Sequence, residues 1–145
     1  MMSRAVLGTA LAALLLASGS PAISRGTQAG VYTAAQAEAG SRVYAIKCAM
    51  CHGAQLEGTV EVPGLVGKFV ANWGGRPLGN LFDYLGRAMP QTAPGTLTPQ
   101  ENAELIAFIL RENGAPAGNR VLPSESAALQ RIDFDAIALP QTPAR

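Results

Sequence analysis

The chain has 145 residues, with 11 lysines and arginines against 10 aspartates and glutamates, and with two cysteines and one histidine. Only 14% of the residues are charged, whereas glycine (16) and proline (10) are plentiful, as in one small, loop-rich domain. The near-zero net charge and the lack of a basic patch or heptad pattern exclude nucleic-acid binding and a coiled coil.

Residues 1–22 have the pattern of a secretory signal peptide. Arg4 precedes a short apolar run over residues 5–17, and Ser20-Pro21-Ala22 is a small-x-small cleavage site, with Thr27-Gln28-Ala29 as a later option. A membrane span needs about twenty apolar residues, which is more than this run contains. We therefore expect export to the periplasm and no membrane span after cleavage. Anchoring by an uncleaved signal is the alternative.

The first predicted helix of the exported part begins at a capping box. Thr33 is the expected N-cap and Gln36 the N3 residue, and the helix should run to about Cys48. Gly40 lies on the same predicted face as Tyr44. Because a glycine inside a helix costs about 1 kcal/mol relative to alanine, we expect another helix to pack against the backbone at Gly40. A tolerated surface glycine is the alternative.

This helix leads into Cys48-Ala49-Met50-Cys51-His52, which contains both cysteines and the only histidine. C-x-x-C-H is the pattern of covalent c-type haem attachment, in which two thiols form thioethers and the adjacent imidazole coordinates the iron. A structural zinc site needs about four nitrogen or sulfur ligands, and the chain offers three. A three-ligand catalytic zinc, a thioredoxin-like redox pair and a simple disulfide remain as alternatives. The redox pair lacks a βαβ context, and the disulfide leaves His52 unexplained.

Glycines and prolines punctuate residues 53–67, which predicts a loop. Trp73, the only tryptophan, follows in an aromatic cluster, where it can either pack in the core or meet the haem edge. Arg76 is a candidate partner for the haem propionates, with an ordinary surface charge as the alternative. Pro77 is expected at the first position of a short amphipathic helix. That helix must end before Met89-Pro90, because a residue preceding proline is pushed out of the α region.

A second capping box, Thr98-Pro99-Gln100-Glu101, predicts a helix over residues 102 to about 112, ended by Asn113-Gly114. A weak helix near residues 124–132 and a terminal tail on the surface complete the chain. No convincing run of alternating strand residues occurs, so the expected fold class is all-α. The expected divisions are a signal peptide (1–22), a flexible N-terminal segment (23–32), one helical domain (33–118) and a C-terminal extension (119–145).

The second axial ligand of an iron held by His52 can be identified by elimination. No second histidine exists, two of the four methionines lie in the predicted signal peptide, and Met50 lies inside the attachment motif. Met89 remains, and the proline after it holds the local chain extended and rigid. A His/Met site favours one-electron transfer over oxygen binding. The alternative is Met89 as core filler in a gas-binding or peroxidase-like haem protein whose sixth site is labile.

Several of these residues occur in a characteristic order: Gly40, Tyr44, Cys48, Cys51-His52, Pro63, Leu65, Met89-Pro90 and Phe108. In this order they resemble the class I c-type cytochromes of bacteria, over about residues 30–115. The resemblance implies a small cytochrome c fold, in which the N- and C-terminal helices cross at Gly40 and Phe108 and loops wrap one covalent haem c. It also implies that the carbonyl of Pro63 accepts the imidazole N–H of His52.

A narrower similarity involves Trp73-Gly74-Gly75 and residues 78–82, 89–97 and 113–118. These stretches resemble cytochromes that accept electrons from periplasmic quinoprotein-type dehydrogenases, or form a domain of them. The resemblance implies an electron carrier and not an enzyme, placed between such a dehydrogenase and a downstream oxidase or cytochrome. It does not extend to Asn102, where the subgroup often has a tyrosine. The chain also offers no nucleophile-base pair for catalysis of its own.

Overall fold

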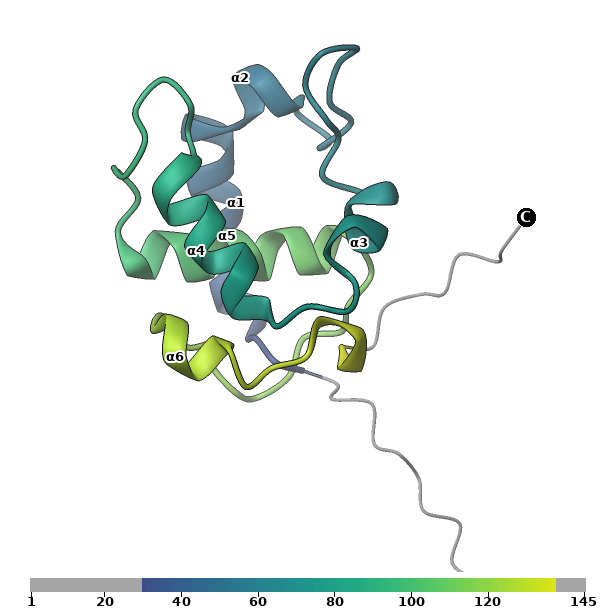
Figure 1. Ribbon diagram of the computed structural model, residues 1–145, viewed down its shortest axis with the longest axis vertical. Coiled ribbons are helices and arrows are strands. Elements are labelled where there is room, and N and C mark those ends of the chain that lie inside the picture. Colours follow the sequence, from purple (N-terminus) through teal and green to yellow (C-terminus); the bar gives the residue numbers. More distant parts are fainter. Residues whose placement is uncertain (1–29, 138–145) are drawn as a thin grey trace, which may run out of the picture.

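Helices form all the regular elements of the computed structural model, which describes residues 30–137 (Figure 1). They are α1 (Ala34–Lys47), α2 (Ala49–His52), α3 (Lys68–Trp73), α4 (Leu78–Ala88), α5 (Pro99–Glu112), α6 (Ser126–Leu129) and a 3₁₀ turn, Phe134–Ala136. Within residues 30–137 there is no strand, and the expected all-α fold is confirmed. No helix in this range is long and apolar enough to cross a membrane. The predicted signal peptide and the end of the C-terminal tail lie outside the described residues.

Both long helices begin at the predicted capping boxes. The N–H of Gln36 donates to Thr33 Oγ1 (3.2 Å), and the N–H of Thr33 donates back to Gln36 Oε1 (3.4 Å). At the start of α5, the N–H of Glu101 donates to Thr98 Oγ1 (3.2 Å) and the N–H of Thr98 to Glu101 Oε2 (2.9 Å). Each box pairs two N–H groups that the first helical turn would otherwise leave without partners.

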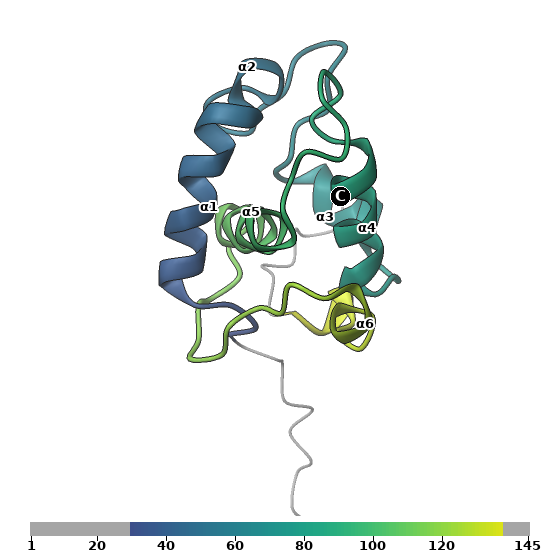
Figure 2. The same cartoon turned by 90° about the vertical axis from the view of Figure 1, so that its left-hand side faces the viewer.

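The two capped helices cross at the predicted glycine. In Figure 2, α5 is seen nearly end-on beside α1. A Cβ on Gly40 would collide with the backbone carbonyl of Glu104 and lie 2.9 Å from Cβ of Phe108. The ring of Tyr44 packs against that of Phe108, with centroids 5.2 Å apart. Gly40 therefore allows α1 and α5 to approach closely, and the predicted crossing with Phe108 is confirmed.

Helix α4 differs from its prediction at one end only. Pro77 is its N-cap and not its first helical residue, since the backbone at Pro77 is extended (φ −63°, ψ 147°). At the other end, α4 stops at Ala88, and Met89 is extended (φ −124°, ψ 149°), as expected for a residue before proline. Helix α3 was not predicted, because the aromatic cluster that it carries is too short to show a helical period.

The structure extends the core beyond the N-terminal boundary drawn from the sequence. Val31 and Tyr32, assigned to the flexible segment 23–32, are 3% and 1% exposed. The hydroxyl of Tyr32 donates to the carbonyl of Ala115 (2.5 Å), and the N–H of Gly118 donates to the carbonyl of Tyr32 (2.8 Å). Tyr32 thus joins the domain, because its side chain is buried and its hydroxyl and carbonyl both find partners beyond α5.

The C-terminal segment, here residues 119–137, packs beneath α4, where Figure 1 shows α6. Its buried side chains are Leu122, Leu129, Phe134 and Ile137. The side-chain amide of Gln36 pairs with the backbone of Leu122 in both directions, at 2.9 Å to the carbonyl and 2.7 Å from the N–H. The helix predicted near residues 124–132 shortens to α6, because the chain after Leu129 turns towards α4.

An ion pair joins the end of α1 to the start of α5, and it predicts an acid-sensitive stability. Lys47 Nζ lies 2.7 Å from Glu101 Oε1, and this hydrogen bond, with that from the Thr98 backbone, lowers the pKa of Glu101 below its ordinary 4.5. A lowered folded pKa stabilises the fold above pH 4.5, and this contribution is lost as pH falls through the folded pKa. Urea unfolding from pH 7 to pH 3 should therefore show Glu101→Gln less stable than the wild type at pH 7, by a difference that shrinks as the pH falls towards 3. Glutamine keeps a side-chain oxygen that can accept from the Thr98 N–H, so the substitution mainly removes the charge. A stability difference that stays constant from pH 7 to pH 3 would therefore contradict a role for the ionised carboxylate.

Candidate functional site

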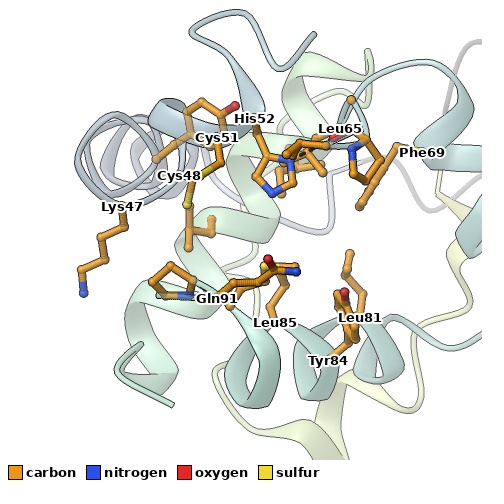
Figure 3. A pocket seen from close by; sticks show the side chains of 18 of the residues that line it. Lys47, Cys48, Cys51, His52, Leu65, Phe69, Leu81, Tyr84, Leu85 and Gln91 are labelled. Atoms are coloured by element: carbon orange, nitrogen blue, oxygen red, sulfur yellow. Dashed lines mark hydrogen bonds between the residues drawn. The ribbon is translucent and has the colours of Figure 1, made fainter. Parts of the chain in front are cut away.

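A cavity of about 580 Å³ lies between α2 and the following loop on one side and α4 on the other (Figure 3). Each site residue proposed from the sequence lines it: Cys48, Cys51, His52, Pro63, Trp73, Arg76 and Met89. These residues come from segments up to 41 positions apart, from Cys48 to Met89. The fold therefore brings the whole candidate set to one cavity.

Helix α2 holds the attachment motif as a single helical turn. The N–H groups of Cys51 and His52 both donate to the carbonyl of Cys48 (3.1 and 3.0 Å), and Gly53 ends the turn at φ 82°. Both cysteines are free thiols, with Cys48 half-buried and Cys51 exposed. Burial raises the pKa of the Cys48 thiol to about 11, although the neighbouring Lys47 acts in the opposite direction. The thiol of Cys48 is therefore neutral at neutral pH.

These three residues do not converge as zinc ligands. Among residues 30–137, no group of three or more histidine, cysteine, aspartate or glutamate side chains is placed to hold a metal ion. The three-ligand zinc alternative for Cys48, Cys51 and His52 therefore finds no matching geometry in the described part of the chain.

His52 points into the cavity and is oriented from behind (Figure 3). Its Nδ1 lies 2.9 Å from the carbonyl oxygen of Pro63, the contact implied by the resemblance. A carbonyl can only accept, so Nδ1 carries the proton in this contact and Nε2 keeps its lone pair. An imidazole held in this way has one nitrogen available to a metal inside the cavity.

The turn that carries His52 is itself held by α1. The hydroxyl of Tyr44 donates to the carbonyl of Gly53 (2.6 Å), directly after the attachment motif. Burial, and after it the nearby Cys48, raises the pKa of Tyr44 to about 12, so the hydroxyl remains a donor at neutral pH. Tyr44 thus contacts both Phe108 at the helix crossing and the backbone that positions His52.

The wall across from His52 is formed by α4 and the residues after it. Leu81, Tyr84 and Leu85 project from α4 into the cavity, and Gln91 follows the helix (Figure 3). Met89 lines the cavity from the end of α4, where its N–H donates to the carbonyl of Leu85 (3.0 Å). The only imidazole of the chain and the methionine chosen by elimination therefore line one space from different elements.

Aromatic rings and one cation form the third wall. The ring of Trp73 packs against those of Phe69 and Tyr84 at centroid distances of 6.2 and 5.7 Å. The guanidinium of Arg76 lies over Trp73, with Cζ 5.8 Å from the ring centroid. Tyr84 was not assigned to the site from the sequence. Its position three residues after Leu81 on an amphipathic helix indicates that both side chains lie on the same face.

The residues around this cavity fit an iron porphyrin. Such a group is flat and apolar, carries anionic propionates, and takes nitrogen or sulfur ligands above and below the iron. The cavity provides leucine and aromatic walls, an imidazole with a free nitrogen, a thioether, and the guanidinium of Arg76. The two thiols of a C-x-x-C-H motif lie at its edge. Fold and site together define a small helical haem protein of the c type.

The comparison with protein families names the group more closely. The family model described as "Cytochrome C oxidase, cbb3-type, subunit III" matches residues 35–109, which include most of both crossing helices, the attachment motif and Met89. The chain belongs to this family and is a class I c-type cytochrome. Its cytochrome c domain implies covalent haem c and electron transfer.

Among solved structures, the chain is similar to one in the "Crystal Structure of the Sulfane Dehydrogenase SoxCD from Paracoccus pantotrophus". The identity is 25% and the TM-score 0.43, and the similarity covers 69% of this chain and 60% of that chain. The chain thus matches less than two thirds of the length of that structure's chain. The search of curated proteins found no match.

Proposed function

We propose that this protein is a periplasmic electron carrier with one haem c, attached through Cys48 and Cys51 and ligated by His52 and Met89. One observation carries the proposal. The hydrogen bond from His52 Nδ1 to the Pro63 carbonyl leaves Nε2 available in the same cavity that Met89 lines. The two free thiols at the edge of this cavity support covalent attachment.

Bound haem would supply a one-electron iron couple, and the chain would supply orientation, water exclusion and tuning. Pro63 fixes the tautomer and ring plane of His52, so that Nε2 is the nitrogen offered to the iron. Met89 offers a thioether, which raises the reduction potential relative to a second nitrogen ligand. Leu81 and Leu85 keep water from the cavity on the α4 side. If His52 and Met89 both hold the iron, the arrangement would suit electron transfer better than the binding of a small ligand.

The proposed route of electrons runs from a periplasmic dehydrogenase to an oxidase or another cytochrome. The similarity of residues 73–75, 78–82, 89–97 and 113–118 to dehydrogenase-associated cytochromes supports the donor. The description of the matching family, which names an oxidase subunit, is compatible with an oxidase as acceptor. The signal-peptide pattern of residues 1–22 supports export. We propose the edge near Cys48 and Cys51 for transfer, because Met50 beside them is 86% exposed.

Covalent attachment provides the first test. The full chain, expressed with a c-haem maturation system, is expected to stain for haem on a denaturing gel and to contain one iron per chain. The double variant Cys48→Ala/Cys51→Ala should lose the stain completely, because no other cysteine can form a thioether. An unstained wild-type protein would contradict the proposal. Rapid carbon monoxide binding by the ferrous wild type would contradict His/Met ligation and favour a labile sixth site.

A further inference from the structure

The C-terminal segment forms hydrogen bonds to the backbone of the turn between α3 and α4. The N–H of Gly75 donates to Asp135 Oδ2 (2.9 Å), the N–H of Phe134 to the carbonyl of Arg76 (3.1 Å), and the N–H of Leu78 to the carbonyl of Ile132 (2.8 Å). Pro77 and Asp133 form an isolated antiparallel bridge between the same two stretches. The turn is thus held at Gly75, Arg76 and Leu78 by a segment that lies outside the matched family region, residues 35–109.

The C-terminal segment is firmly placed by contacts of its own. Phe134, next to Asp135, is 1% exposed, and Leu129 is fully buried. Further back along the chain, Leu122 is paired with the side chain of Gln36 on α1. Because Leu122 is anchored on α1, away from the turn, and Phe134 is buried next to Asp135, the segment can act as a fixed support for the turn.

The turn needs such a support. It contains two adjacent glycines, and Gly75 has a φ of +72°, with no atom near the place of a Cβ. Glycine in this conformation has wide backbone freedom, so the turn does not fix its own geometry. Arg76 follows directly, and its guanidinium lies over Trp73 and lines the cavity. The backbone contacts at and around Arg76 therefore fix the point from which its side chain reaches the cavity.

We propose that Asp135 is a positioning residue, which acts through the Gly75 amide to hold the Arg76 guanidinium at the haem cavity and thereby raises the reduction potential. This inference rests on the proposed function, since it requires bound haem. A cation held at the cavity favours the reduced form, which has one positive charge fewer. Arg76 is already exposed, so a guanidinium released from the Trp73 ring would move further into solvent, where its charge is screened more strongly and has less effect.

The test compares two variants of the haem-loaded full chain. Asp135→Ala and Asp135→Asn both remove the carboxylate charge, but asparagine retains an oxygen that can accept from the Gly75 N–H. Because both variants share the loss of charge, their difference isolates the hydrogen bond, and the midpoint potential of Asp135→Ala should be lower than that of Asp135→Asn. In an Arg76→Gln background this difference should vanish. Equal potentials for the two variants, or a difference that persists without Arg76, would overturn the proposal.

A second readout does not require the potential. Hydrogen exchange of the Gly75 amide should be faster in Asp135→Ala than in Asp135→Asn, whereas a purely global loss of stability would speed exchange throughout the protein. If the alanine variant does not fold, Asp135→Ser, whose shorter side chain should not reach the amide, replaces it with the same expected result. Failure of the proposed function would show as a wild type without covalent haem. Failure of this inference alone would leave a normal wild type and unchanged exchange at Gly75.

Discussion

Replacing Met89 with alanine is expected to abolish the weak sulfur-to-iron band of the ferric spectrum and to lower the midpoint potential by on the order of 100 mV. Axial ligands set haem potentials over a range of about 0.8 V. In the proposed site the thioether of Met89 would stabilise ferrous iron more than ferric iron, so its loss should disfavour reduction. A one-electron shift of 59 mV corresponds to a tenfold change in equilibrium constant. Spectra of both oxidation states and a redox titration measure the two effects together.

Met50→Ala is the matched control for this substitution. Both methionines line the cavity, but Met50 is 86% exposed and lies inside the attachment motif, on the same element as His52, whereas Met89 lies at the end of α4, across from His52. Replacement of Met50 should leave the band and the potential unchanged. Met89→His should also lower the potential and remove the band, because a second nitrogen ligand favours ferric iron. A band that survives Met89→Ala, or disappears with Met50→Ala, would show that Met89 is not the ligand.

Local signals in the sequence predicted the long helices well. The capping boxes at Thr33 and Thr98 act within four residues, so they mark helix starts without knowledge of the fold. The crossing at Gly40 was also predictable, since a mid-helix glycine indicates close backbone contact. The proposed iron ligands could be chosen from composition alone. The chain has one histidine, and three of its four methionines could be set aside by their positions in the sequence.

Contacts distant in the chain were not predictable. The amide of Gln36 meets Leu122, and the carboxylate of Asp135 meets Gly75, but nothing near these residues in the sequence indicates either partner. Asn102 shows the same limit at the position where the resemblance fails. It is 2% exposed and its Nδ2 donates to the carbonyl of Phe82 (2.8 Å), while within residues 30–137 its Oδ1 has no partner. Such pairings depend on the packing of whole elements, which a local pattern does not encode.

Gly40→Ala is expected to destabilise the protein by about 2 kcal/mol. A Cβ at this position would collide with the backbone carbonyl of Glu104 and crowd Cβ of Phe108, so α1 and α5 must move apart. Overpacking of this kind typically costs about 1–3 kcal/mol, and a backbone carbonyl yields less than a side chain. The higher helix propensity of alanine offsets about 1 kcal/mol of this cost. Thermal unfolding should show a midpoint lower by roughly 10 °C for a domain of this size.

Gly86→Ala separates this contact from the general effect of adding a methyl group to a helical glycine. A Cβ on Gly86 in α4 would meet only the side-chain amide of Asn102, at 3.2 Å, so the stability should change by less than about 1 kcal/mol. If Gly40→Ala lowers the midpoint no more than Gly86→Ala, the close crossing of α1 and α5 is contradicted. Phe108→Ala should not rescue Gly40→Ala, because the colliding atoms are Cβ of residue 108 and the backbone at Glu104, and both remain in that variant. Contact with the main chain of α5 thus limits the size of residue 40, and only glycine fits at this position.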